Sequence, residues 1–240
     1  YGKRRSKMKF IVVGARGQLG QELVHMLTER KAEYVAFGSD ELNITNRQQV
    51  FDVFADENPD VVLDAAAYTA VDAAEDEGKE INWKVNFEGT KNLADASNLV
   101  GAKLLFVSTD YVFDGTKEDP YLETDNVGPK NEYGKAKLAG EKAVQESGAD
   151  YYIIRTSWVF GYFGKNFVYT MKRLGEQLDN LTVVNDQKGR PTWTYTLADF
   201  MLHLVDVSAP YGIYNLSNDG QATWFEFAKK IAEFSNSSVK

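Results

Sequence analysis

A glycine-rich turn between an apolar run and an amphipathic stretch restricts the fold of this chain more than any other feature. Residues 9–13 form a short, mainly apolar run rich in β-branched residues that stops at Gly14, as a buried parallel strand would. Glycines stand at positions 1, 4 and 7 of residues 14–20, and residues 18–30 have the pattern of an amphipathic helix. Backbone amides and the helix dipole at such a helix start stabilise a pyrophosphate. The turn therefore predicts a dinucleotide site, and a tight turn without a ligand is the less favoured alternative.

Strand-like and helix-like segments continue to alternate up to about residue 156. The predicted strands are residues 34–37, 61–65, 103–108 and 150–156, and the predicted helices are residues 47–57, 83–100 and 131–147. A crossover between parallel strands needs a dozen or more residues, so this spacing indicates a parallel sheet with helices on both faces. The predicted fold class is α/β, with a doubly wound, Rossmann-type parallel sheet.

The alternation loosens after Trp158, where Gly, Asn and aromatic residues become frequent. Short strands are predicted at residues 181–185 and 212–216, and a helix at residues 223–234. Open α/β sheets bind ligands at the carboxyl edge of their strands. We therefore expect residues 8–157 to form a dinucleotide-binding Rossmann domain and residues 158–240 to form mainly a smaller C-terminal substrate-binding lobe. Residues 1–7 are expected to be an added remnant or a disordered start.

Composition excludes several classes of function. The chain has 27 Lys and Arg against 35 Asp and Glu, a net charge of -8, which disfavours non-specific attraction to nucleic acid or anionic membranes. It has no Cys, which excludes disulfides, thiolate metal sites and cysteine nucleophiles. No apolar run reaches membrane-spanning length, and no signal-peptide pattern follows the basic first residues. We expect a cytoplasmic protein that binds neither nucleic acid nor membrane, with His25 and His203 serving packing.

A tyrosine and a lysine four residues apart are the best candidates for catalysis. Tyr133 and Lys137 would stand on one face of the predicted helix, and Thr109 follows the strand that ends at the same edge of the sheet. Hydride addition to a ketone creates an alkoxide that must be protonated, and Tyr133 would donate that proton. An ordinary tyrosine has a pKa of about 10, and lowering it to near 7 requires about 4 kcal/mol. We expect Lys137 and the oxidised nicotinamide to supply this stabilisation, with Thr109 orienting the carbonyl and Ser108 ranked second.

The choice between NADPH and NADH depends on the end of the second strand. Dinucleotide-binding proteins often carry an acid there that binds the adenosine ribose, but Gly38 stands at that position and Asp40 comes slightly late. Arg16, inside the glycine turn, would either meet a 2′-phosphate or be a solvated turn residue. The prediction is NADPH, with NADH possible.

Several segments resemble the dTDP-4-dehydrorhamnose reductases, a family of the extended short-chain dehydrogenases, over residues 8–234. They are residues 14–20, 65–72, 108–115, 133–141, 155–161 and 186–192. The resemblance implies reduction of the nucleotide sugar dTDP-4-dehydro-6-deoxy-L-mannose to dTDP-L-rhamnose, in dTDP-rhamnose and polysaccharide biosynthesis. It also implies a substrate that is a small molecule.

The resemblance also implies a role for residues at matching positions. The cofactor contacts would be Gly14, Gly17, Gln18, Leu19 and Gly20 at the pyrophosphate, Asn43 and Ile44 by the adenine, Ala65, Ala66 and Ala67 by the ribose and nicotinamide, and Tyr133 and Lys137. The catalytic residues would be Thr109, Tyr133 and Lys137, and the substrate contacts Thr109, Asp110, Tyr111, Trp158 and Asn166. For Trp158, an aromatic residue in the core is the alternative.

Two departures from the family pattern bear on metal, assembly and the substrate pocket. Some members bind magnesium at a dimer interface through glutamates; Glu22 matches one, but Tyr195 stands where another would be. We therefore expect no required metal, Mg²⁺ included, and a monomer or weak homodimer. The chain stops at Lys240, short of the family's usual C-terminal segment, so we expect part of the nucleotide-sugar pocket to be missing.

Two other functions share parts of this pattern. Sugar-nucleotide 4,6-dehydratases show Thr-Asp-Glu at the strand end, whereas this chain has Thr109, Asp110 and Tyr111, so ketone reduction fits better and an epimerase stays open. A non-catalytic NADP-binding regulatory subunit is the other alternative. The presence of Tyr133 and Lys137 beside Thr109 argues against it.

Overall fold

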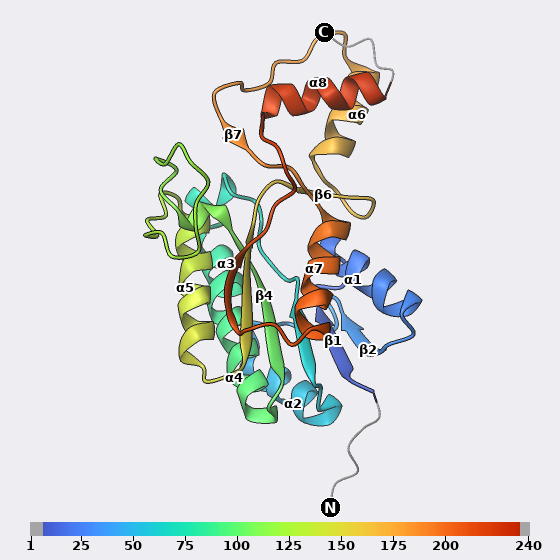
Figure 1. Ribbon diagram of the computed structural model, residues 1–240, viewed down its shortest axis with the longest axis vertical. Helices are drawn as coiled ribbons and strands as arrows, with labels where there is room; N and C mark the ends of the chain where they lie inside the picture. The colour runs from blue at the N-terminus through green and yellow to red at the C-terminus, as the bar shows by residue number, and fades with distance from the viewer. Residues whose placement is uncertain (1–6, 236–240) are drawn as a thin grey trace, which may run out of the picture.

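The computed structural model describes residues 7–235, and its centre is a six-stranded sheet in the order β2-β1-β3-β4-β5-β9 (Figure 1). The strands are β1 (Lys9–Val13), β2 (Glu33–Phe37), β3 (Val61–Asp64), β4 (Lys103–Thr109), β5 (Tyr151–Thr156) and β9 (Gly212–Asn215). All neighbouring strands of this sheet pair in parallel. The predicted parallel sheet is confirmed, while residues 1–6 of the expected remnant lie outside the described residues.

Helices cover both faces of the sheet, as a doubly wound fold requires. On one face, α1 (Gln18–Glu29) and α7 (Thr194–Asp206) bury leucines and methionines against the strands. On the other face lie α2 (Arg47–Glu57), α4 (Thr90–Val100) and α5 (Glu132–Glu146). No helix within residues 7–235 is long and apolar enough to cross a membrane.

Local capping explains where the helix that carries the Tyr-Lys pair begins. The side chain of Asn131 accepts a hydrogen bond from the Gly134 amide at 2.7 Å and caps α5.

The single helix predicted at residues 83–100 is in fact three segments: α3 (Lys79–Trp83), the π-helical η2 (Lys84–Gly89) and α4. The wider turn of η2 holds Asn86, whose amide pairs with the backbone of Tyr68 in both directions.

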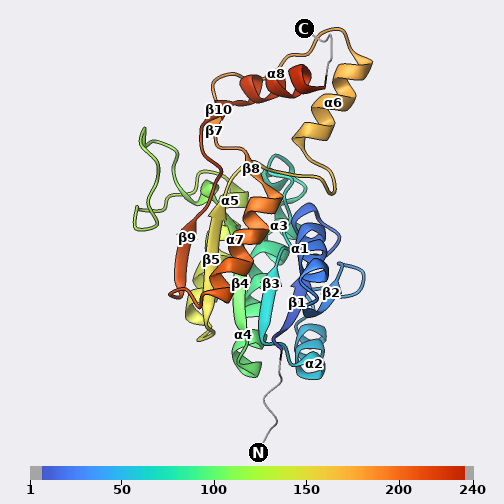
Figure 2. The same ribbon diagram turned by 45° about the vertical axis from the view of Figure 1, so that its right-hand side comes forward.

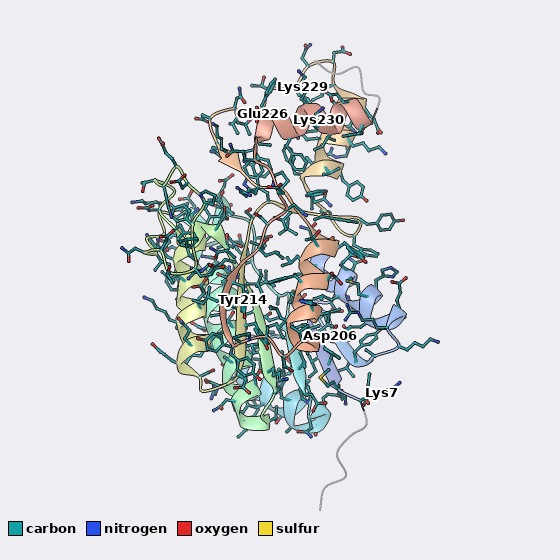
Figure 3. The ribbon with its side chains drawn as sticks, in the orientation of Figure 1. Lys7, Asp206, Tyr214, Glu226, Lys229 and Lys230 are labelled. Carbon is teal, nitrogen blue, oxygen red and sulfur yellow. The ribbon has the colours of Figure 1, made fainter. Side chains whose placement is uncertain are left out.

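A smaller lobe stands at the carboxyl edge of the sheet, at the end of the molecule opposite the N-terminus (Figure 2). It contains α6 (Phe167–Gln177) and α8 (Trp224–Phe234), with β7 (Lys188–Gly189) paired to β10 (Ala222–Thr223). The short strands β6 (Val159–Phe160) and β8 (Thr192–Trp193) connect it to the main body. In Figure 3, Glu226, Lys229 and Lys230 mark α8 in the lobe, while Asp206 and Tyr214 lie on the main body.

Two features of the second half differ from the sequence-based expectation. The strand predicted at residues 181–185 is wrong: the segment is irregular, Val184 is 52 % exposed, and the Val184 carbonyl accepts a hydrogen bond from the Phe225 amide at the start of α8. The chain also returns to the main body after the first part of the lobe. Residues 194–215 form α7, which packs against α1, and then β9, which adds the sixth strand beside β5.

Candidate functional site

The glycine turn is shaped to receive a phosphate group. Gly14 has a φ of +75°, and a Cβ at this position would lie 2.6 Å from the backbone nitrogen of Ala66, so only glycine fits. Gly17 begins α1, and no side chain in the described part of the protein caps this helix start. The first turn of α1 also contains no acidic residue. Its amides are therefore available to an anion, and the helix dipole favours negative charge there.

The other expected pyrophosphate residues lie on the same first turn. Leu19 is buried in the core, and Gly20 lies directly over the Gly14 carbonyl. The side chain of Gln18 donates to the Val159 carbonyl at 3.1 Å, while its own oxygen is buried without a hydrogen-bond partner among residues 7–235. This unsatisfied acceptor beside free amides fits a site that is completed by a ligand.

Arg16 lies at the end of β2, where the adenosine ribose is expected. Its guanidinium pairs with Asp40 at 2.7 Å and with Glu41 at 3.6 Å. A Cβ at residue 38 would lie 2.7 Å from the Arg16 side-chain nitrogen, so Gly38 gives this side chain its room. Farther along, Asn43 is at the surface and accepts hydrogen bonds from Thr45, while the Ile44 side chain is buried.

The end of β3 places a buried acid next to the expected nicotinamide contacts. Ala65, Ala66 and Ala67 follow this strand, and the Ala66 amide donates to Asp64 at 3.0 Å. Asp64 is 1 % exposed, and its second carboxylate oxygen has no hydrogen-bond partner in the described residues. Burial raises the pKa of Asp64 to about 6, although the positive charge of Lys137 opposes this. Sequence analysis missed Asp64, although a polar residue at a strand's carboxyl end was a usable signal.

Lys137 points from α5 into the same buried region. Its ammonium donates to the Val107 carbonyl at 2.6 Å and lies 4.2 Å from the centre of the Phe106 ring. The residue is 1 % exposed, and burial lowers its pKa to about 8, while the charges of Asp64 and Glu141 act in the opposite direction. The side chain thus remains largely cationic at neutral pH.

The structure brings Thr109 and Tyr133 together, as expected. A Cβ at residue 134 would lie 2.3 Å from the Tyr111 carbonyl oxygen, so Gly134 lets the start of α5 approach the segment after β4. The Tyr133 phenol lies close to the side chain of Thr109, which is 5 % exposed. The Tyr111 ring meets the Tyr133 ring edge-on, with 6.0 Å between their centres. Thr109, Tyr133 and Lys137 therefore share the carboxyl end of β4.

A carboxylate extends this arrangement toward solvent. The Thr109 hydroxyl donates to Asp110 at 3.2 Å, and the Tyr111 amide donates to the Thr109 hydroxyl oxygen at 3.1 Å. Solvent reaches Asp110, yet protein surrounds most of its carboxyl group, and this desolvation raises its pKa to about 6. Burial and then the charge of Asp110 raise the pKa of Tyr133 above its ordinary value. The lowering of the Tyr133 pKa expected from Lys137 together with the oxidised nicotinamide stays a prediction.

A buried ion pair behind the site was not found from the sequence. Glu141, one turn after Lys137, accepts from two nitrogens of Arg155 at 2.9 and 2.7 Å and from the Ser108 hydroxyl at 2.6 Å. Ser108, the second-ranked catalytic candidate, thus donates within this buried network. The network ties α5 to β4 and β5.

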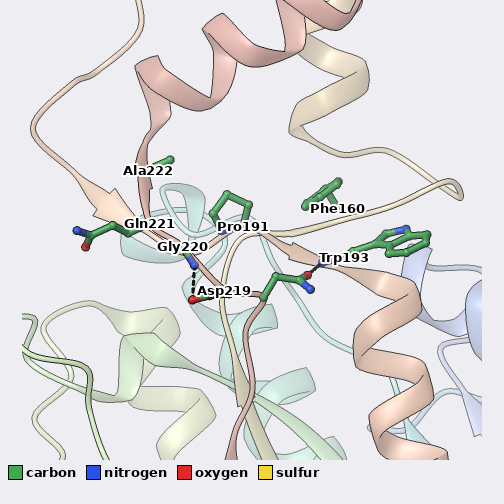
Figure 4. A pocket seen from close by; sticks show the side chains of 8 residues that line it. Phe160, Pro191, Trp193, Asp219, Gly220, Gln221 and Ala222 are labelled. Carbon is green, nitrogen blue, oxygen red and sulfur yellow. Dashed lines mark hydrogen bonds between the residues drawn. The ribbon is translucent and has the colours of Figure 1, made fainter.

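The expected sugar-nucleotide residues of the lobe have structural contacts. Trp158 stacks on Trp224 with 3.6 Å between ring centres, and Asn166 caps α6 and donates to the Gly161 carbonyl. An open pocket lies where the lobe meets the main body (Figure 4). It is lined by Phe160, Pro191, Trp193, Asn218, Asp219, Gly220, Gln221 and Ala222. None of the expected catalytic residues borders it.

Glu22 and Tyr195, the two residues that bear on the expected absence of a metal, both have contacts within the protein. Glu22 is buried and accepts a hydrogen bond from the Thr194 hydroxyl at 2.8 Å. Tyr195 is exposed and stacks on Trp193. Between residues 7 and 235, no three His, Asp or Glu side chains gather in a way that could hold a metal ion.

Comparison with known proteins gives a consistent result. The family described as RmlD substrate binding domain matches residues 8–240. A dTDP-4-dehydrorhamnose reductase of Burkholderia thailandensis is 42 % identical over 232 residues, covering 93 % of this chain and 77 % of that protein. One from Streptomyces griseus is 45 % identical over 221 residues, covering 90 % and 72 %. The crystal structure of dTDP-4-dehydrorhamnose reductase from Bacillus anthracis in complex with NADP superimposes with a TM-score of 0.94 at 43 % identity, covering 98 % of this chain and 83 % of that one.

Proposed function

The chain belongs to the RmlD substrate binding domain family, and on that premise we propose that it reduces dTDP-4-dehydro-6-deoxy-L-mannose to dTDP-L-rhamnose with NADPH. The observation that carries the proposal is the meeting of Thr109, Tyr133 and Lys137 at the same sheet edge as the uncapped start of α1. A nucleotide sugar is the small-molecule substrate. A ketone reduction of this kind belongs to dTDP-rhamnose biosynthesis.

The residues around the glycine turn fit a dinucleotide. When bound, NADPH supplies the hydride that reduces the ketone. Gly14, Gly17 and Gly20 admit the pyrophosphate to the amides of α1, and the unpaired Gln18 oxygen accepts a hydrogen bond from the ligand. Arg16, whose guanidinium pairs with Asp40 at the end of β2, would bind a 2′-phosphate, and the similar Bacillus anthracis structure is a complex with NADP; both support NADPH over NADH.

The proton for the new hydroxyl group comes from Tyr133 in this proposal. Its raised pKa keeps the phenol protonated at neutral pH, so the acid is ready before the alkoxide forms. Thr109 hydrogen-bonds the carbonyl oxygen and orients it, and Lys137 contributes a positive charge that stabilises the phenolate left after proton transfer. The edge-on Tyr111 ring forms one wall of the sugar site, with Asp110 beside it.

Oligomeric state and location are further parts of the proposal. We expect a monomer or weak homodimer in the cytoplasm, with no nucleic-acid or membrane partner, in keeping with the net charge of -8. The internal hydrogen bond of Glu22 supports a reaction without a required metal.

The proposal is tested by following NADPH oxidation at 340 nm. The full-length protein is mixed with the 4-keto nucleotide sugar and either NADPH or NADH, with and without EDTA. We expect oxidation only with the sugar present, faster with NADPH, and no effect of EDTA. Absence of oxidation with either cofactor would refute the proposed reaction, and loss of the rate in EDTA would refute its metal-free form.

A further inference from the structure

We propose that Asp110 returns a proton to Tyr133 after each turnover, through the hydroxyl group of Thr109. The inference rests on the proposed function, because it takes Tyr133 as the acid that protonates the reduced ketone. It assigns Asp110 a catalytic task in addition to any contact with the sugar.

Three oxygen atoms lie in series from the half-buried Tyr133 to solvent. The Tyr133 phenol lies close to the Thr109 side chain, and the Thr109 hydroxyl donates to Asp110 at 3.2 Å. The Tyr111 amide holds the Thr109 oxygen from a third direction at 3.1 Å, as part of the cap of the short helix η3 (Asp110–Val112). The backbone therefore fixes the middle of the series, and Asp110 is its solvent-exposed end.

The need for such a route follows from the burial of Lys137. Lys137 is 1 % exposed and already donates to the Val107 carbonyl. Each turnover leaves a phenolate at Tyr133 that must regain a proton before the next ketone is reduced. Asp110 is linked to Tyr133 through Thr109, and it is an acid that can take up a new proton from solvent.

The charges around Asp110 favour transfer in this direction. Tyr111 lies on the same short helix and Tyr133 on α5. Burial raises the pKa of Tyr111, and so do the charges of Asp110 and then of Asp72, which lies in the loop before the helix η1 (Ala73–Glu75). Desolvation raises the pKa of Asp110 to about 6, so the carboxyl group takes up protons close to neutral pH. The pKa of Tyr133 lies above its ordinary value, so a proton moves downhill from Asp110 to the phenolate.

The step balances without any further reactant. The O–H bond of the Asp110 carboxylic acid breaks, and its proton goes to the Thr109 oxygen. Thr109 releases its own hydroxyl proton to the Tyr133 phenolate, forming a neutral phenol. Asp110 is left as a carboxylate and takes a proton from bulk water. No bond to carbon changes and nothing is oxidised or reduced.

The relay predicts that Asp110→Asn affects later turnovers and spares the first. In stopped-flow measurements of NADPH oxidation, we expect the variant to oxidise one NADPH per active site at a rate within about twofold of the unmodified protein. The following steady-state kcat should be on the order of tenfold lower or more, with a larger solvent deuterium isotope effect, since positioned proton transfer is worth about a hundredfold or more. Asp119→Asn, an exposed acid on the same surface connection, is the matched control and should leave both phases unchanged.

The alternatives give different results. An unchanged kcat in Asp110→Asn would overturn the relay, and so would equal loss of the first and later turnovers with a raised KM, because that pattern marks a sugar contact. If the unmodified protein oxidises no NADPH with the sugar, the proposed function fails. NMR titration of ¹³C-tyrosine-labelled protein tests the contact without cofactor or substrate: the Tyr133 pKa should fall in Asp110→Asn, and an unchanged value would overturn the coupling.

Discussion

The buried pair of Arg155 and Glu141 offers a stability test of the structure behind the site. Two hydrogen bonds of 2.9 and 2.7 Å join these side chains, which are 4 % and 1 % exposed. Removing one partner of such a pair leaves an uncompensated buried charge and costs about 3–5 kcal/mol. Arg155→Met should therefore lower the unfolding free energy by about 3–5 kcal/mol, which corresponds to a fall in Tm of about 6–20 °C for a chain of this size.

A double variant distinguishes the cost of an unpaired buried charge from general damage to core packing. Arg155→Met with Glu141→Leu removes both charges, leaving the Ser108 hydroxyl without its acceptor at a cost of about 1–3 kcal/mol. We expect the double variant to be more stable than Arg155→Met alone. Urea unfolding followed by tryptophan fluorescence, together with the slope of the transition, measures both variants. The reasoning would be refuted by a loss below about 1 kcal/mol in the single variant, or by equal instability of the two.

Two further substitutions test the electrostatics of the site. Arg16→Ala should weaken NADPH binding by about 10–100-fold in calorimetric titration, because a hydrogen bond to a charged group contributes a free energy of this size. NADH binding should change little. Equal losses of affinity for both cofactors would contradict the role of Arg16 at the 2′-phosphate. The pKa of Asp64 in the folded protein, about 6, lies above its ordinary value of 3.8. Between pH 3.8 and pH 6 the folded protein therefore binds more protons than the unfolded chain. Its unfolding free energy falls by up to about 3 kcal/mol as the pH rises through this range. Asp64→Asn should flatten this dependence in urea unfolding at pH 4.5 and 7, and an unaltered difference between the two pH values would exclude Asp64 as its source.

Local patterns were sufficient to predict the elements that carry the cofactor turn and the Tyr-Lys pair. The apolar run before Gly14 could only be a buried strand, and Asn131 marks the start of α5 within one residue of the prediction. The spacing of Tyr133 and Lys137 follows from helix geometry alone. These features depend on neighbours in sequence.

The features that could not be predicted depend on contacts between distant residues. Residues 181–185 have a strand-like composition but are irregular, and the Val184 carbonyl pairs with the start of α8; strand propensity counts only where ladder pairing is available. The helix α7 packs against α1, which follows from the topology and not from its own pattern. Asp64 and Lys137 approach each other only through the sheet, and the raised pKa of Tyr133 follows from burial that no spacing reveals.

Tyr133 is proposed as the acid that protonates the reduced ketone. The turnover of Tyr133→Phe, measured together with NADPH affinity and with unfolding in urea, tests this role. We expect turnover to fall by a factor of at least about a hundred, while NADPH affinity and folding are retained. A variant that reduces the 4-keto sugar at the rate of the unmodified protein would contradict it.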